Sequence, residues 1–320
     1  MLVFSLRTLM NNLILHQYAA SPFSEKVRCL LGYKQQAYRT VEIPVIMPKP
    51  DLMALTGGYR KTPVLQVGAD IYCDTSLICR LIDRLFPDKP VYSNEQMATI
   101  GAAAHWTDTF LFKVSVAVAF QPKALAGSDL FSDQATAEAF TADRADFSKG
   151  STALGIELAI AEPHWLLHMR RLDNQLSTAD FLGGDAPNIL DFSTYHCCWF
   201  VYKNDVLKAD LDEFPALLKW MHAMQAFGQG DAVAMTGQQA VDIANSSEIA
   251  TEPKLATIAA EQLSLGDMVD VMPIDYGFQP TRGELLVASM EEIVVRRLDQ
   301  RAGHVAVHFP RLGFQVSKAV

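Results

Sequence analysis

The chain has 320 residues, half of them hydrophobic, and a formal net charge of −9. This length accommodates two domains with room for a small third one, and the apolar half suffices for a substantial core. The negative charge, with Lys and Arg scattered along the chain, argues against a nucleic-acid partner. Because no apolar run approaches the roughly 18 residues of a membrane-spanning helix, no membrane span is expected.

Five cysteines stand at positions 29, 73, 79, 197 and 198, an odd number without CxxC or metal-ligand spacing. This usage fits a reducing cytoplasm best. Met1–Leu9 lacks the long apolar core and the small-residue cleavage site of a signal peptide, so none is expected. The sequence leaves open whether translation starts at Met1 or at Met10.

The N-terminal third begins with a predicted strand over residues 12–17. The turn Tyr18-Ala19-Ala20-Ser21-Pro22-Phe23-Ser24 follows and leads into a helix that is expected to begin near Glu25. A second strand over 38–43, a loop containing three prolines and a short helix over 51–55 come next.

Residues 60–78 carry the next two elements. Two β-rich runs, 64–67 and 71–73, are joined by Gly68-Ala69-Asp70, which predicts a hairpin. Pro63 cannot donate a hydrogen bond to a sheet, so it should open the first strand and leave the backbone of Thr62 able to pair with a bound peptide. The simpler alternative is a proline that merely begins an edge strand.

Asp74-Thr75-Ser76 stands directly before an apolar stripe at helical spacing, which runs to Leu85. Small polar residues at this place predict an N-cap. The free N–H groups of the first helical turn could also bind a ligand carboxylate, with capping alone as the alternative.

The order strand, turn, helix, hairpin and capped helix resembles the thioredoxin-like half of a cytosolic glutathione transferase over residues 12–90. Ser21-Pro22-Phe23-Ser24-Glu25-Lys26-Val27-Arg28 stands where the family has its catalytic turn, Thr62-Pro63 at its cis-proline, and Asp74-Thr75 at its acidic-plus-hydroxyl pair. The resemblance implies glutathione as co-substrate, no metal, and a homodimer. It also implies a set of glutathione-binding residues: Phe23, Lys49, Thr62, Pro63, Asp74, Thr75 and Ser76.

The resemblance also implies how glutathione would lie. Its backbone would cross the edge at Thr62, its γ-glutamyl carboxylate would meet the helix start at Asp74-Thr75-Ser76, and its sulfur would approach Ser21. Asp74 suits the glutamyl ammonium group, and Lys49 could supply a cation to the glycine end. A solvated loop lysine is the alternative for Lys49.

A linker with two prolines in five residues, 86–90, divides this domain, 11–90, from a helical one, 93–230. Helical patterns cover 95–120, 153–176 with a break near Pro163, and 214–227, whereas 128–148 is either helical or a loose connection. Asn188 and Asp191 predict a capping box at the start of a helix through Phe200, as in the helical domain of the resembled family.

Residues 236–320 depart from that family's usual plan. Short β-rich runs over 268–274, 284–288, 293–298, 304–309 and 314–316 alternate with glycines and predict a small β-barrel or sheet unit. His304 and His308 would share one face of a strand, but without a third identifiable ligand a surface or packing role is favoured over a metal site. The overall prediction is a thioredoxin-like α/β domain, an all-α domain and a small β-rich extension.

The resemblance implies that a hydroxyl activates the glutathione thiol. Ser21 is the first candidate, as in serine-type members, with capping of the helix as its alternative, and Tyr18 is the second. The electrophile would lie between the two domains near Tyr18, Trp106, Phe110 and Phe112, although such aromatics more often belong to a core. No cysteine occupies the turn, which counts against thiol-disulfide exchange.

The leading prediction is therefore a cytoplasmic glutathione transferase acting on a small apolar electrophile. A glutathione-dependent isomerase or lyase, and a non-catalytic binding protein on the same scaffold, are the alternatives.

Overall fold

The computed structural model describes residues 13–93, 95–126, 133–255 and 263–319. Asn12, residues 128–132 and both candidate start methionines lie outside this part of the chain. The chain divides into two compact units, the first made of residues 1–24, 36–85 and 231–320 and the second of 25–35 and 86–230.

The first unit contains the predicted thioredoxin-like elements. These are β1 (Leu13–Gln17), β2 (Ala37–Glu42), α3 (Pro50–Thr56), β3 (Val64–Val67), β4 (Asp70–Cys73) and α4 (Thr75–Leu85). β1 pairs with β2 in parallel and with β3 antiparallel, and β3 and β4 form the predicted hairpin.

The C-terminal strands continue this same sheet. They are β5 (Asp231–Ala234), β6 (Lys254–Leu255), β7 (Met268–Pro273), β8 (Thr281–Ala288), β9 (Glu292–Asp299), β10 (Gly303–Pro310) and β11 (Phe314–Lys318), with helix α13 (Gly237–Ser246) between β5 and β6. Within the described ranges the sheet has eleven strands in the order β11-β7-β8-β9-β10-β4-β3-β1-β2-β5, with β6 beside β8.

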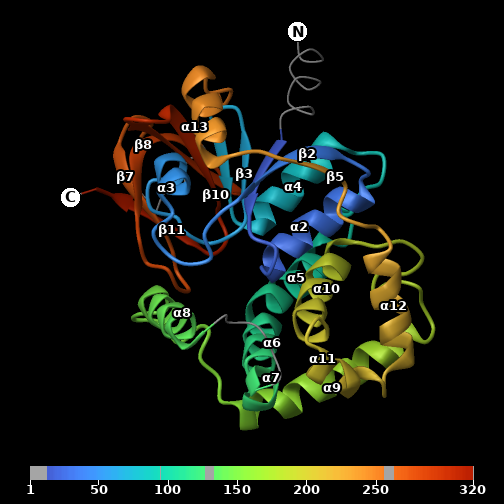
Figure 1. Cartoon of the computed structure of the whole chain (residues 1–320). Coiled ribbons are helices and arrows are strands. Elements are labelled where there is room, and N and C mark those ends of the chain that lie inside the picture. Colours follow the sequence, from blue (N-terminus) through green and yellow to red (C-terminus); the bar gives the residue numbers. More distant parts are fainter. Residues whose placement is uncertain (1–12, 94, 127–132, 256–262, 320) are drawn as a thin grey trace. The chain divides into compact units, whose positions relative to one another are not determined.

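The junction is the parallel pairing of β10 with β4, which joins red and blue-green strands in Figure 1. At the opposite edge, β5 pairs with β2. The five strand runs predicted for the C-terminal region are therefore present. They do not form the separate barrel or sheet expected for 236–320, because the backbone groups at the edge of β4 pair with β10 instead of remaining open.

One face of the sheet is buried against α3 and α13. Alternate strand residues point to this face, among them Ile14, Ile71 and Val307, and they pack with Leu52 and Val241 from the two helices. N-terminal and C-terminal residues of the first unit therefore share this core.

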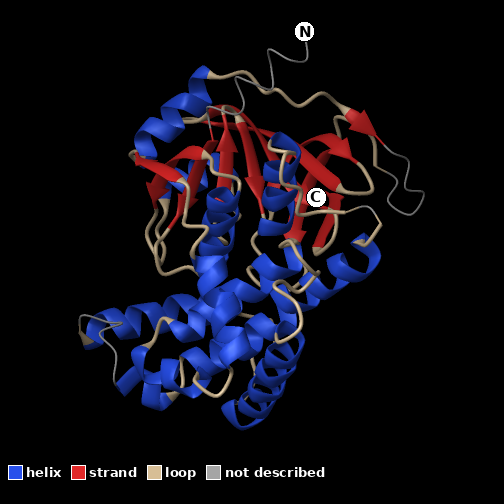
Figure 2. Ribbon diagram, turned by 90° about the vertical axis from the view of Figure 1, so that its right-hand side faces the viewer, coloured by secondary structure: helices blue, strands red, loops and turns tan. Residues whose placement is uncertain are grey.

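The second unit is helical, as predicted (Figure 2). Its α-helices are α2 (Pro22–Tyr33, which starts in the first unit), α5 (Ala102–Trp106), α6 (Phe112–Ala119), α7 (Pro122–Ala126), α8 (Gln134–Phe147), α9 (Leu158–Leu176), α10 (Ile189–Tyr202), α11 (Asp205–Lys208) and α12 (Pro215–Gln225). Met97–Gly101 and Thr107–Leu111 are π-helical, and Ala209–Leu211 is a 3₁₀ turn.

Two local predictions in this unit have different outcomes. The capping box of α10 is confirmed, since Asn188 accepts from the N–H of Leu190 and Asp191 accepts from the N–H of Asn188. The break near Pro163 is wrong, because α9 runs through it. Pro163 removes one backbone hydrogen bond, and the buried stripe from Ala161 to Leu176 holds the helix together.

No helix in the described ranges has both the length and the apolar character that crossing a bilayer requires.

Candidate functional site

Strand pairing brings three predicted stretches of the first unit to one end of the sheet. Val64, the first residue of β3, pairs with His16 of β1 and Cys73 of β4, and both of those strands run antiparallel to β3. The end of β1, the start of β3 and the end of β4 therefore lie together at one end of the sheet. That end carries Tyr18 and Ser21, then Thr62 and Pro63, and finally Asp74, Thr75 and Ser76.

Ser21 lies in the turn between β1 and α2 and is buried, with 2% of its surface exposed. Its N–H donates to the carbonyl of Tyr18 over 3.0 Å, and its Oγ accepts from the N–H of Ser24 over 3.2 Å. Ser21 thus caps α2, which begins at Pro22, earlier than predicted, with Phe23 half-buried in its first turn. A hydroxyl that accepts one hydrogen bond keeps its own proton for donation, so capping is compatible with a role as donor.

A buried lysine connects the first two stretches. Lys49 is 3% exposed, so the alternative of a solvated loop lysine does not describe it. Its ammonium lies 5.6 Å from the centre of the Tyr18 ring, and its Nζ donates to Oγ1 of Thr62 over 3.5 Å. A fixed positive charge at this place is suited to a carboxylate ligand.

The Thr62–Pro63 peptide bond is cis, which the sequence left open, and Met47–Pro48 is cis as well. Pro63 is buried and stands directly before β3, so it opens that strand as predicted.

Asp74 occupies the N-cap position of α4, directly before Thr75. Its Oδ1 accepts from the N–H of Ser76 over 2.9 Å and from the Ser76 hydroxyl over 2.6 Å. The predicted N-cap is therefore confirmed. Asp74 has a φ of 73°, a left-handed backbone that Asp tolerates better than most residues, and Thr75 behind it is buried.

The aromatics predicted for the electrophile pocket lie mostly in the second unit. Trp106 and Phe110 stack with their centres 5.4 Å apart, and they contact His168 and His164 of α9 at 5.3 and 5.6 Å respectively. Burial, followed by the charge of Arg171, lowers the pKa of His168 to about 4. Because Tyr18 belongs to the other unit, a pocket shared with it stays a prediction.

The second unit also contains a buried ionic network that the sequence did not predict. Asp108 accepts from Lys26 over 2.6 Å and from Ser193 over 3.2 Å, and its Oδ1 lies 3.0 Å from Nε2 of His196. Burial alone would raise the pKa of Asp108, but the charges and hydrogen bonds of Lys26 and His196 together outweigh it and lower the pKa to about 2. Phe112 packs 6.0 Å from the His196 ring, beside this network.

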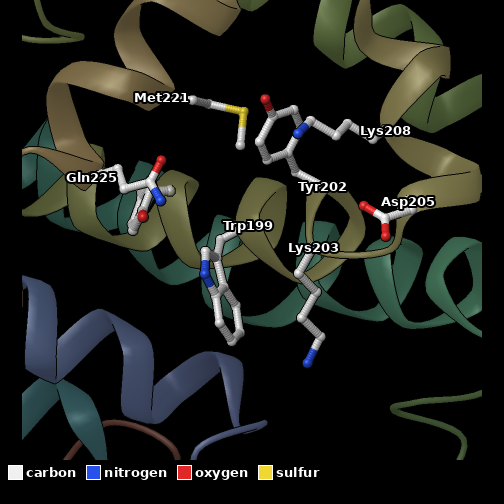
Figure 3. A pocket seen from close by; sticks show the side chains of 8 residues that line it. Trp199, Tyr202, Lys203, Asp205, Lys208, Met221 and Gln225 are labelled. Carbon is white, nitrogen blue, oxygen red and sulfur yellow. The ribbon is translucent and has the colours of Figure 1, made fainter. Parts of the chain in front are cut away.

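A hollow of about 180 Å³ opens in the helical unit (Figure 3). It is lined by α10, α11 and α12 with Tyr195, Trp199, Tyr202, Lys203, Asp205, Lys208, Met221 and Gln225. Burial lowers the pKa of Lys203 to about 8. None of the residues predicted for the site lines this hollow.

Comparisons with known proteins bear on the whole chain. Residues 15–90 match the family model described as glutathione S-transferase, N-terminal domain. A curated relative, pyrimidodiazepine synthase from Drosophila melanogaster, is 21% identical over 216 residues, which cover 64% of this chain and 73% of that protein. The solved structure of a GST-like protein from Pseudomonas syringae is 38% identical, covers 97% of this chain and 100% of that one, and superimposes with a TM-score of 0.81.

The last match extends over nearly the entire chain, so it includes the C-terminal strands that depart from the usual family plan. With that identity over that coverage, the chain belongs to the glutathione S-transferase family.

Proposed function

We propose that this protein is a glutathione transferase that activates the glutathione thiol for attack on a small apolar electrophile. The observation that supports it best is the strand register, which gathers the stretches at Ser21, Thr62 and Asp74 at one end of the sheet. Family membership supports glutathione as the ligand of that end.

In this proposal the glutathione backbone pairs with Thr62 at the start of β3. The γ-glutamyl carboxylate meets the first turn of α4, where Thr75 and Ser76 follow Asp74, and Asp74 faces the glutamyl ammonium group. Lys49 serves the glycine carboxylate, since its ammonium is already held beside Thr62. Pro63 and Phe23 are the remaining proposed glutathione-binding residues, and their apolar side chains contribute shape rather than charge.

Ser21 donates its hydroxyl proton in a hydrogen bond to the glutathione sulfur. A free thiol has a pKa of about 8.5 and is only a few per cent ionised at neutral pH. Lowering this pKa by about two units, equivalent to roughly 2.7 kcal/mol, would make most of the bound thiol a thiolate. Stabilising the anion by a hydroxyl at a helix N-terminus is a physical route to that shift. Tyr18 is the second candidate for the same role.

The electrophile is proposed to contact Tyr18, Trp106 and Phe110, and no metal takes part. The protein is proposed to act as a homodimer in the cytoplasm, a location favoured by five buried cysteines that form no disulfide.

Two observations favour alternatives within the same family. The curated relative is named a synthase, which keeps glutathione-dependent isomerase or lyase chemistry in view. Ser21 is buried and engaged in capping, which favours a non-catalytic binding protein on the glutathione-transferase scaffold if its hydroxyl cannot reach the sulfur.

The test is calorimetric titration with reduced glutathione, followed by turnover of a panel of electrophiles. Ser21→Ala should cut turnover at least about tenfold, a loss of about 1.4 kcal/mol in transition-state stabilisation. It should also raise the pKa of the bound glutathione thiol, as measured from the pH profile of kcat/KM for the electrophile at saturating glutathione. Thr75→Ala should weaken glutathione binding.

Thr236→Ala is the matched control. Thr236 caps α13 in the same unit, and its hydroxyl accepts from the N–H of Gln239 over the same 3.2 Å as Ser21 does from Ser24. Both variants lose an N-cap worth about 1 kcal/mol, but only Ser21→Ala should lose turnover. Full activity of Ser21→Ala would transfer the role to Tyr18, and no binding at millimolar glutathione would reject the transferase proposal.

A further inference from the structure

The loop between β7 and β8, residues 274–280, lies against the segment that leads into Thr62–Pro63. Lys61, the residue before Thr62, forms an ion pair with Asp275 of this loop, with Nζ and Oδ1 2.6 Å apart. The Lys61 side chain is 12% exposed and that of Asp275 37%. A largely buried ammonium thus has its carboxylate partner in the loop between two C-terminal strands.

Tyr276 adds a second contact to the same ammonium. Nζ of Lys61 lies 3.8 Å from the centre of the Tyr276 ring, within the range of a cation–π interaction. Asp275 Oδ1 also accepts from the N–H of Tyr276 over 2.8 Å, which orders the two loop residues relative to each other. The loop therefore holds Lys61 through both its carboxylate and its aromatic ring.

The segment before Lys61 is fastened to the neighbouring strands as well. Thr281 at the start of β8 donates to the buried carbonyl of Thr56 over 3.1 Å. The carbonyl oxygen of Pro280 approaches Gly58 so closely that a Cβ there would lie 2.5 Å from it. Arg297 of β9 donates to the carbonyl of Ala54.

These contacts run from the end of α3 to the residue before Thr62.

We propose that the β7–β8 loop is a positioning element of the glutathione site, which holds Lys61 through Asp275 and Tyr276 and thereby fixes the backbone of Thr62 for pairing with the peptide. This inference rests on the proposed function. Its physical basis is preorganisation: a strand start that is already immobile loses less conformational entropy when it pairs with a ligand. In this arrangement the ammonium of Lys61 is held by the loop, and Lys49 is the lysine proposed to contact the ligand.

The test uses Asp275→Asn in the full chain, which keeps the shape of the side chain and removes its charge. Two readouts are needed: hydrogen exchange of the amides of residues 60–66 without ligand, and the Kd of reduced glutathione. We expect exchange in this segment to become about tenfold faster and glutathione to bind about fivefold to tenfold more weakly, as befits the loss of a charge-assisted contact.

Asp270→Asn is the control. Asp270 forms a bidentate pair with Arg282 in the same β7–β8 hairpin, but it lies within strand β7 and not in the loop. It should leave both readouts unchanged.

Exchange and affinity that change no more in Asp275→Asn than in Asp270→Asn would overturn the inference alone. Failure of the unaltered protein to bind glutathione would overturn the proposed function and, with it, this role of the loop. Faster exchange together with weaker binding, seen only in Asp275→Asn, would support both.

Discussion

His308 on β10 lies 3.0 Å from Asp70 on β4, from Nε2 to Oδ1, where the C-terminal strands join the N-terminal sheet. Its Nδ1 lies 2.7 Å from Oε1 of Glu292 on β9, and its ring stacks on Tyr72. Thr251 donates a further hydrogen bond to Asp70. These contacts satisfy buried polar groups on both sides of the junction, so the pairing of β10 with β4 is supported by side chains as well as by backbone.

The His308 network predicts a pH-dependent stability. Burial opposes protonation of His308, but the hydrogen bonds and the charges of Asp70 and Glu292 together outweigh it and raise its pKa above 6.5. The stability from the protonated ring is therefore complete below pH 6.5 and is lost as the pH rises through the raised pKa. Each unit of the shift corresponds to about 1.4 kcal/mol.

The pKa of Asp70 is shifted in the opposite direction to that of His308. Burial would raise its pKa, but the hydrogen bond and charge of His308, together with hydrogen bonds from Thr251 and Ala250, lower it below 3.8. The stability that the charged Asp70 contributes is present above pH 3.8 and is lost as the pH falls through the lowered pKa.

His308→Gln should thus reduce the unfolding free energy more at pH 6 than at pH 9, measured by urea denaturation. His304→Gln, at an exposed position of the same strand, should change it by less than about 0.5 kcal/mol at either pH. An equal loss at both pH values for His308→Gln would contradict the charged pair.

Deletion of residues 236–320 should abolish the folded first unit. The deletion removes β10 from beside β4 and removes the C-terminal half of the core that Ile71 and Val307 share. The exposed strand edge and apolar face should lead to aggregation. The soluble fraction and the circular dichroism spectrum measure this outcome. A folded remainder that still binds glutathione would instead identify the C-terminal strands as an appended module.

Asp108→Asn should destabilise the helical unit by about 3–5 kcal/mol, because it leaves the buried ammonium of Lys26 without its carboxylate. Asp210→Asn removes a carboxylate from the exposed Lys123 pair and should cost at most about 1 kcal/mol. Chemical denaturation of both variants gives the comparison. Equal effects would show that burial of the Lys26 pair has no energetic consequence.

Asp74→Ala should destabilise the protein by about 2 kcal/mol. It removes an N-cap, worth about 1 kcal/mol, and places alanine at a left-handed position, which costs about 1 kcal/mol more. Asp74→Asn keeps an acceptor and tolerates that backbone, so its unfolding free energy should remain near that of the unaltered protein.

If Asp74 faces the glutamyl ammonium group as proposed, Asp74→Asn should nevertheless weaken glutathione binding in calorimetry. Unchanged affinity in this stable variant would restrict Asp74 to capping.

The sequence by itself determined the local features of this protein. Pro63 opening a strand, Asp74 capping α4 and Asn188 capping α10 depend on hydrogen bonds within a few residues, so their patterns are readable without a fold. Short stretches of this kind also resemble the glutathione transferase family, and that resemblance predicted Ser21, Thr62 and Asp74 as site residues.

Only the tertiary structure decided which distant segments meet. The C-terminal strand pattern predicts strands but not that β10 completes the edge of β4, because the choice of a strand's neighbour depends on packing across the whole sheet. Asp70 and His308 are 238 positions apart in the sequence, and Lys61 and Asp275 are 214 positions apart. No local sequence pattern predicts either pair. The contact between Lys61 and the β7–β8 loop could not be predicted from the sequence, because it depends on how the strands of this sheet pair.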